Sequence, residues 1–65
     1  MSDDPGLGIS AQIAAVKREI AMRERVYPAL VARNKMKSSA AEYELRAMRS
    51  VLATLERVGQ GGSNE

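Results

Sequence analysis

Apolar side chains recur at helical spacing through the first half of this chain. Their separations of three, four or seven residues place them in one stripe on a helical wheel. The stripe consists of Ile13, Val16, Ile20, Tyr27 and Val31, and Ile9 would extend it. The pattern predicts a helix over residues 10–34, with Ser10 as a suitable N-cap.

A second apolar stripe follows in the other half of the chain. Its separations alternate between four and three, and its members are Ala41, Leu45, Met48, Leu52 and Leu55, widened by Val51 and Val58. Ser39 and Glu42 have the spacing of a capping box at a helix start. Gly59 is typical of the residue that ends a helix. We therefore expect a second helix over residues 39–58.

The connection between these two stripes is short. Its sequence, RNKMKSS over residues 33–39, forces the helices to lie antiparallel, and Asn34 tolerates the positive φ that such a reversal needs. The sequence thus predicts an all-α fold, a two-helix antiparallel hairpin over residues 10–58. Residues 1–9 are expected to form a flexible leader and residues 59–65 a flexible tail, because glycine and proline in these segments oppose regular structure.

Pro28 interrupts the first helical pattern. A proline inside a helix removes one backbone hydrogen bond and crowds the preceding turn, at a cost of about 3 kcal/mol. Either one long helix is kinked, or the helix breaks and Pro28 starts a second piece. Since the apolar stripe keeps its phase from Ile20 through Tyr27 to Val31, we expect a first helix kinked at Pro28.

The first helix carries a second apolar face. Ala11, Ala15, Met22, Val26 and Ala29 lie more than about 90° from the main stripe on the wheel. A chain of 65 residues has little core of its own, and without cysteine or histidine it lacks disulfides and the usual zinc ligands. Self-association remains as the stabilising device. We expect a homodimer in the form of a four-helix bundle.

Positive charge is concentrated in the middle of the sequence. Residues 17–37 contain seven of the ten basic residues, and the net charge of the whole chain is only +2. The candidate binding residues are Arg23, Arg25, Tyr27, Arg33, Lys35 and Lys37 around Pro28 and the turn, together with Tyr43. Each has a structural alternative: the cations favour a helix C-terminus, Tyr27 fits the core stripe, and Tyr43 suits either a solvated surface or an interface.

The composition excludes most catalytic chemistry. Without histidine and cysteine, the common nucleophile–base pairs and proton shuttles are absent, and no glycine-rich phosphate loop precedes a helix. We expect no enzymatic activity, no metal site and no cofactor. No apolar run approaches the roughly 20 residues that span a bilayer, and the acidic start is unlike a signal peptide. The expected location is the cytoplasm, with no membrane partner.

Residues 18–55 resemble a group of small uncharacterised proteins encoded by bacteriophages and prophages. The resemblance lies in an M-R-x-R-V-Y-P-x-x-V core, a basic turn with K-M, and an A-x-x-E-x-x-x-M helix. In this chain the matching positions are Met22, Arg23, Arg25, Val26, Tyr27, Pro28, Val31, Lys35, Met36, Ala41, Glu44 and Met48. The resemblance implies a helical hairpin that acts as a phage accessory protein in the bacterial cytoplasm.

Three functions are compatible with these features. The leading hypothesis is a non-enzymatic accessory protein that binds a host or phage macromolecule, in most cases a protein, as an inhibitor or adaptor. The first alternative is a small nucleic-acid or nucleotide-binding protein that uses the basic residues 17–37. The second alternative is a structural component of a phage particle.

Overall fold

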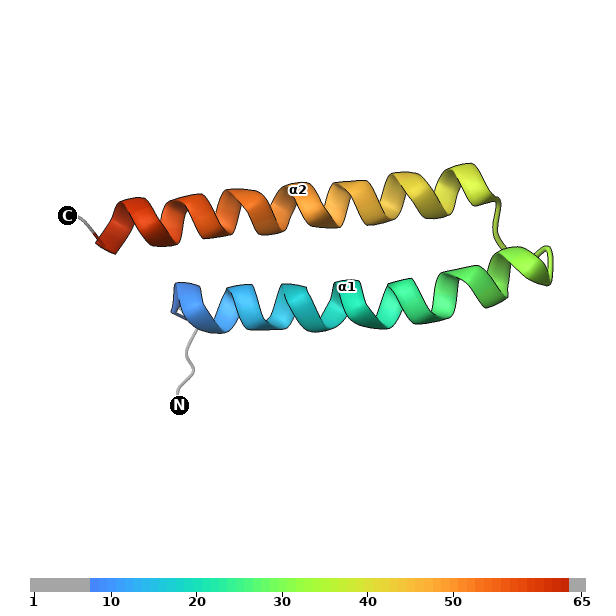
Figure 1. Ribbon diagram of the computed structural model, residues 1–65, viewed down its shortest axis with the longest axis horizontal. Coiled ribbons are helices and arrows are strands. Elements are labelled where there is room, and N and C mark those ends of the chain that lie inside the picture. Colours follow the sequence, from blue (N-terminus) through green and yellow to red (C-terminus); the bar gives the residue numbers. More distant parts are fainter. Residues whose placement is uncertain (1–7, 64–65) are drawn as a thin grey trace.

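The protein folds as a single helical hairpin. The computed structural model describes residues 8–63, with side chains described for residues 8–60. Helix α1 (Ile9–Ala32) and helix α2 (Ser38–Ser63) run antiparallel side by side and are joined by a short turn (Figure 1). No strand occurs within residues 8–63, which confirms the predicted all-α hairpin. Residues 1–7 of the predicted leader lie outside the described part.

Helix α1 begins one residue earlier than the sequence pattern predicts. Gly8 occupies the N-cap position in an extended conformation, and its carbonyl accepts a hydrogen bond from the amide of Gln12 at 3.1 Å. This hydrogen bond closes the first turn from Gly8, so Ile9 is helical rather than part of a leader. The prediction that Ser10 caps the helix is therefore wrong, and Ser10 lies within the first turn.

The turn follows α1 through a well-defined C-terminal motif. The amide of Asn34 donates a hydrogen bond to the carbonyl of Val31 at 3.0 Å, and the amide of Lys35 donates one to the carbonyl of Leu30 at 2.8 Å. These two hydrogen bonds, with Arg33 as C-cap, form a Schellman motif. Asn34 has the left-handed φ of 59° that this motif requires, as its sequence position predicts. Helix α1 consequently ends at Ala32 instead of residue 34.

Both predicted ends of the second helix need correction. The carbonyl of Lys37 accepts the amide of Ala41 at 3.0 Å, so the helix starts at Ser38 and Ser39 is already inside its first turn. Ser39 and Glu42 are thus out of register for the expected capping box. At the other end, the helix continues through Gly59 to Ser63, and residues 59–63 are not a tail.

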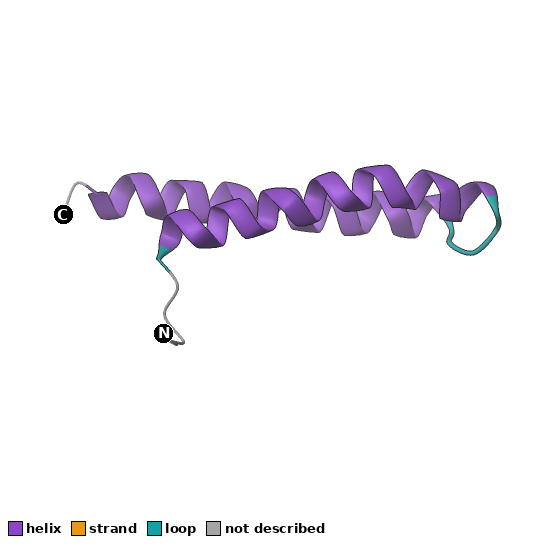
Figure 2. Ribbon diagram, turned by 90° about the horizontal axis from the view of Figure 1, so that it is seen from below, coloured by secondary structure: helices purple, strands orange, loops and turns teal. Residues whose placement is uncertain are grey.

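Packing against α1 explains why Gly59 stays helical. Its φ is not positive, and a Cβ placed on it would lie 3.6 Å from Ile9 Cγ1 and 3.7 Å from Ile13 Cδ1. The backbone of α2 therefore passes close to the start of α1, and this tertiary contact outweighs the weak helix propensity of glycine. The two helices lie side by side along their common length in Figure 1, and in the view of Figure 2 they overlap and cross.

Pro28 lies inside α1 without ending it. The helix runs unbroken from Ile9 to Ala32. The alternative, in which the helix breaks and Pro28 starts a second helical piece, is therefore not observed. Because Pro28 has no amide proton, the carbonyl of Glu24 lacks its usual helical partner. The stripe keeps its phase across this point, since Tyr27 and Val31 are both half-buried between the helices.

The core between the helices is thin. Within the described residues, only Ile20 and Ala41 are buried, with 8% and 7% of their surfaces exposed. The other stripe residues are half-buried: Ile9, Ile13, Val16, Tyr27, Val31, Leu45, Met48, Leu52 and Leu55. Val51 and Val58 are exposed and do not widen the stripe as predicted. The molecule is only 15 Å deep along its shortest axis, which corresponds to one layer of helices.

Candidate functional site

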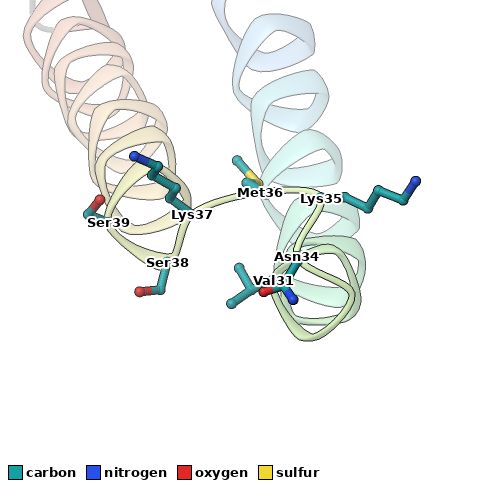
Figure 3. Close-up of a pocket in the computed structure, with 7 residues that line it drawn as sticks. All are labelled: Val31, Asn34, Lys35, Met36, Lys37, Ser38 and Ser39. Atoms are coloured by element: carbon teal, nitrogen blue, oxygen red, sulfur yellow. The ribbon is translucent and has the colours of Figure 1, made fainter.

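Three of the predicted binding residues surround the turn. Arg33, Lys35 and Lys37 are all exposed there, close to the point where α1 ends and α2 begins. Lys35 and Lys37 border a shallow depression between the helix ends, but their side chains extend to opposite sides of the loop (Figure 3). The turn is therefore a basic tip, although its two lysines do not converge on one point.

Arg23 and Tyr27 form a small network on the surface of α1. Arg23 Nε donates a hydrogen bond to the hydroxyl of Tyr27 at 3.1 Å, and the same guanidinium forms an ion pair with Glu19 one turn earlier. The hydrogen bond to Glu19, and then that to Tyr27, raise the pKa of Arg23 above its ordinary value. Arg23 is thus a permanent cation whose charge is already partly compensated within its own helix.

Arg25 and Tyr43 lie apart from the other candidates. Arg25 is exposed on the side of α1 that is turned away from α2 by its wheel position. Tyr43 is 62% exposed on the outer side of α2, and neither side chain forms a hydrogen bond with another described residue. The structure therefore does not bring all seven predicted binding residues into one site.

An apolar groove lies beside Pro28 where the two helices approach the turn. It has a volume of about 370 Å³, within the range of roughly 300–1,000 Å³ that is usual for ligand pockets. Its walls are Tyr27, Pro28, Val31 and Ala32 from α1 and Ser38, Ala41, Glu42 and Leu45 from α2. Apolar atoms make up nearly all of the lining, which suits an apolar side chain from a partner.

This groove does not follow from the periodic pattern of the sequence. The pattern places Tyr27, Val31, Ala41 and Leu45 in the core, and they do face the neighbouring helix. The missed signal is the combination of a proline with two alanines, Ala32 and Ala41, at the end of the apolar stripes. Small side chains and a proline leave space between the two helices near the turn, so an apolar hollow remains there.

The groove and the basic tip are next to each other. Arg33, Lys35 and Lys37 follow α1 directly after the groove residues Val31 and Ala32, and Ser38 belongs to the groove itself. An apolar hollow with Glu42 in its wall, close in sequence to the cations of the turn, fits a partner segment that presents an apolar side chain. Binding is the chemistry that this arrangement supports.

The described residues contain neither a metal-binding cluster nor a membrane-spanning helix. Among residues 8–63, no three or more side chains of His, Cys, Asp and Glu gather closely enough to hold a metal ion. Neither helix is long and apolar enough in its described residues to span a membrane. Comparison of the chain with protein-family models, curated protein sequences and solved structures gives no significant match.

Proposed function

We propose that the protein is a non-enzymatic accessory protein of the phage type that binds a host or phage protein in the bacterial cytoplasm, as an inhibitor or adaptor. The observation that carries this proposal is the apolar groove beside Pro28, whose wall residues Ala32 and Ser38 directly precede and follow the turn that carries the three cations. The groove would receive an apolar side chain, while Arg33, Lys35 and Lys37 would contact acidic neighbours on the partner. At protein interfaces, large apolar side chains at the centre usually contribute most of the binding energy, and charged and polar residues form the rim.

The position of Pro28 supports this function. A proline in the middle of a helix is destabilising, yet here it forms one wall of the groove. We propose that Pro28 kinks α1 and that the kink holds the groove open between the helix ends. The loss of helix stability is then offset by the binding surface that the proline creates.

We also propose that two copies associate into a four-helix bundle. One hairpin forms a single layer with two buried side chains among its described residues, whereas stable domains normally consist of at least two packed layers. Without cysteine, the chain cannot add disulfides in compensation. A second copy would supply the missing layer.

A matched pair of variants tests the groove. Ala32→Glu places a carboxylate in the groove, and Ala14→Glu places the same charge at an equivalent wheel position of α1, five turns away. Both alanines are exposed, so both variants should retain the helix content of the wild type by circular dichroism. In affinity capture from host lysate, Ala32→Glu should lose the partner at least tenfold and Ala14→Glu should retain it. Equal capture by both variants would contradict a partner site at the groove.

The alternative of nucleic-acid binding has its own test. The same cations would neutralise phosphates, and phosphate binding weakens steeply between about 50 and 200 mM salt. A fluorescently labelled oligonucleotide should not bind at low salt if the protein-binding proposal is correct. Salt-sensitive oligonucleotide binding that survives Ala32→Glu but is lost on reversing the charges of Lys35 and Lys37 would favour the alternative.

The effect of Pro28 can be measured independently. In Pro28→Ala, the new amide can donate to the carbonyl of Glu24, so the free energy of unfolding should rise by up to about 3 kcal/mol. Partner capture should fall together with this gain in stability, because α1 straightens and the groove narrows. Chemical denaturation measures the first effect and lysate capture the second. If Pro28→Ala is more stable and still captures the partner fully, the proposal that Pro28 is needed for partner binding is wrong.

A further inference from the structure

A chain of polar contacts runs along α1 and ends at a wall of the groove. Glu19 forms an ion pair with Arg23, and Arg23 Nε donates a hydrogen bond to the Tyr27 hydroxyl at 3.1 Å. The three residues are four positions apart, so they follow one another along the same side of the helix. Tyr27 is also a wall residue of the groove beside Pro28. A contact that holds the ring of Tyr27 therefore affects the shape of the groove.

The hydrogen bond determines on which flank of α1 the ring of Tyr27 lies. In an α-helix, a tyrosine has two favourable χ1 rotamers, and both direct the ring over the residues three and four positions earlier. For Tyr27 these residues are Glu24 and Arg23, which lie on opposite flanks of the apolar stripe. Pro28 and Glu42, two walls of the groove, lie on the flank of Glu24. The ring that is bonded to Arg23 is therefore directed away from the flank on which the groove opens.

Arg23 occupies a position where the helical spacing favours an apolar residue. It follows Ile20 by three residues and precedes Tyr27 by four, so it lies at the edge of the apolar stripe. Only 27% of its side chain is exposed, and a cation with so little contact to water needs polar partners. Both of its partners belong to its own helix. A leucine would extend the stripe here without such compensation, so packing alone does not account for the arginine.

We propose that Arg23 is a positioning residue for the groove, and that its hydrogen bond keeps the ring of Tyr27 off the flank on which the groove opens. The inference deepens the proposed function and rests on it, because an open groove matters only if a partner enters it. Without the bond, the ring would divide between its two rotamers and would narrow the groove at the end away from the turn. The usual net strength of one hydrogen bond corresponds to a roughly 2- to 12-fold change in the ratio of two conformations.

Two substitutions of Arg23 separate the hydrogen bond from the charge. Arg23→Gln keeps an N–H donor at the same distance along the side chain as Nε and removes the charge. Arg23→Met keeps a flexible side chain of similar reach and has no N–H donor. The matched control is Arg18→Met, because Arg18 is an exposed cation of the same helix at a wheel position turned away from α2.

The χ1 rotamer of Tyr27 is the first measurement. Three-bond couplings between Hα and Hβ, measured by NMR, report this rotamer directly, and the only other aromatic side chain is the exposed Tyr43. The wild type, Arg23→Gln and Arg18→Met should each show one rotamer, whereas Arg23→Met should show averaging between two. A mere loss of stability would leave the couplings of the folded protein unchanged. One rotamer in Arg23→Met, or averaging in Arg23→Gln as well, would overturn the proposal.

Partner capture from host lysate is the second measurement. Arg23→Met should capture the partner roughly 2- to 12-fold less well, in line with the loss of one hydrogen bond. Arg23→Gln should restore capture, and Arg18→Met should leave it at the wild-type level. Equal losses in Arg23→Gln and Arg23→Met would mean that the charge of Arg23 contacts the partner, which overturns a positioning role. Full capture by Arg23→Met despite a mobile ring would overturn it too.

The two measurements keep this inference separate from the proposed function. The couplings are recorded on the protein alone, so they decide whether Arg23 holds Tyr27 whatever the partner is. The Ala32→Glu and Ala14→Glu pair decides whether a partner binds at the groove. Unchanged couplings in Arg23→Met together with loss of capture by Ala32→Glu would overturn the positioning role and leave the proposed function intact.

Discussion

Tyr27 combines an apolar role and a polar role in one side chain. Its ring is half-buried and forms part of the groove, while its hydroxyl accepts a hydrogen bond from Arg23 Nε at 3.1 Å. Tyr27→Phe keeps the ring and removes only the acceptor. The free energy of unfolding should fall by about 0.5–1.5 kcal/mol, the usual net value of one hydrogen bond.

The matched control for this change is Tyr43→Phe. Tyr43 is largely exposed and its hydroxyl contacts no described residue, so its loss should change stability by less than about 0.5 kcal/mol. Urea denaturation of both variants gives the comparison. Identical stabilities would mean that the hydroxyl of Tyr27 contributes nothing in solution.

Gly59 shows how a tertiary contact can overrule a local sequence signal. A glycine after an apolar stripe usually takes a positive φ and ends the helix, and there an alanine is strained. In this hairpin Gly59 is inside α2 with no positive φ, and a Cβ would meet Ile9 and Ile13 at ordinary van der Waals distance. Gly59→Ala should therefore stabilise the protein by about 0.5–1 kcal/mol.

The sign of the Gly59→Ala effect discriminates between the two conformations. A rise in the thermal midpoint agrees with a helix that continues to Ser63, whereas a fall would indicate a helix that ends at Gly59. Gly8→Ala serves as a comparison, because Gly8 is the N-cap and has open space around it. That change should be destabilising, since alanine is a poor N-cap residue.

At the scale of the helices, the periodic pattern predicted correctly that two helices exist and pair with each other. It was less accurate about the residues at which each helix begins and ends. The stripe residues Ile20 and Ala41 are the two buried side chains among the described residues, and Asn34 adopts the left-handed turn conformation expected of it. Spacing determines which side of a helix is apolar, so these features follow from sequence. The starts at Ile9 and Ser38 depend on which carbonyl closes the first turn, which spacing does not determine.

The candidate site was predicted less completely for a related reason. The basic tip is visible in the sequence because its cations are adjacent, but the groove requires two helix ends to be placed side by side. Ala41 follows Pro28 by 13 residues in the sequence, and only the folded hairpin makes both of them walls of one hollow. A local sequence pattern does not show contacts between segments that are far apart in the sequence.

The ion pair between Glu24 and Arg49 joins α1 and α2 on the surface of the hairpin. Both side chains are about half exposed, so the pair should contribute roughly 0.2–1 kcal/mol at low salt. A double-mutant cycle with Glu24→Gln and Arg49→Gln should measure this coupling, and it should shrink in about 1 M salt, where charges are screened.

A second cycle provides the control for the register. Arg46 is exposed on α2 one turn before Arg49 and has no ion pair within the described residues. Glu24→Gln combined with Arg46→Gln should therefore give a coupling close to zero. Coupling to Arg46 in place of Arg49 would mean that the helices pair one turn out of the register seen here.

At the scale of the whole molecule, the thin core and the exposed apolar side chains have the same cause. A single layer 15 Å deep leaves most stripe residues half-buried and places Met22, Val26, Val51 and Val58 in solvent. Full burial of an exposed side chain of this kind contributes roughly 1.5–3 kcal/mol, and these residues, at 36–55% exposed, would gain the part that corresponds to their remaining exposure. Association into the proposed four-helix bundle would therefore add to the core and form the interface at the same time, and folding would be coupled to assembly.

Coupled folding and assembly predicts that thermal stability depends on protein concentration. For a dimer of two such chains, a tenfold increase in concentration should raise the thermal midpoint by about 5 °C, because mass action favours the assembled state. Circular dichroism scans from ~5 to ~500 µM would measure the shift. Val51→Glu, which replaces an exposed valine by a charge, should lower the midpoint and its concentration dependence, whereas Ala53→Glu should retain both. A wild-type midpoint that stays constant over this range would show that one hairpin is stable alone, and the exposed valines would then need another explanation.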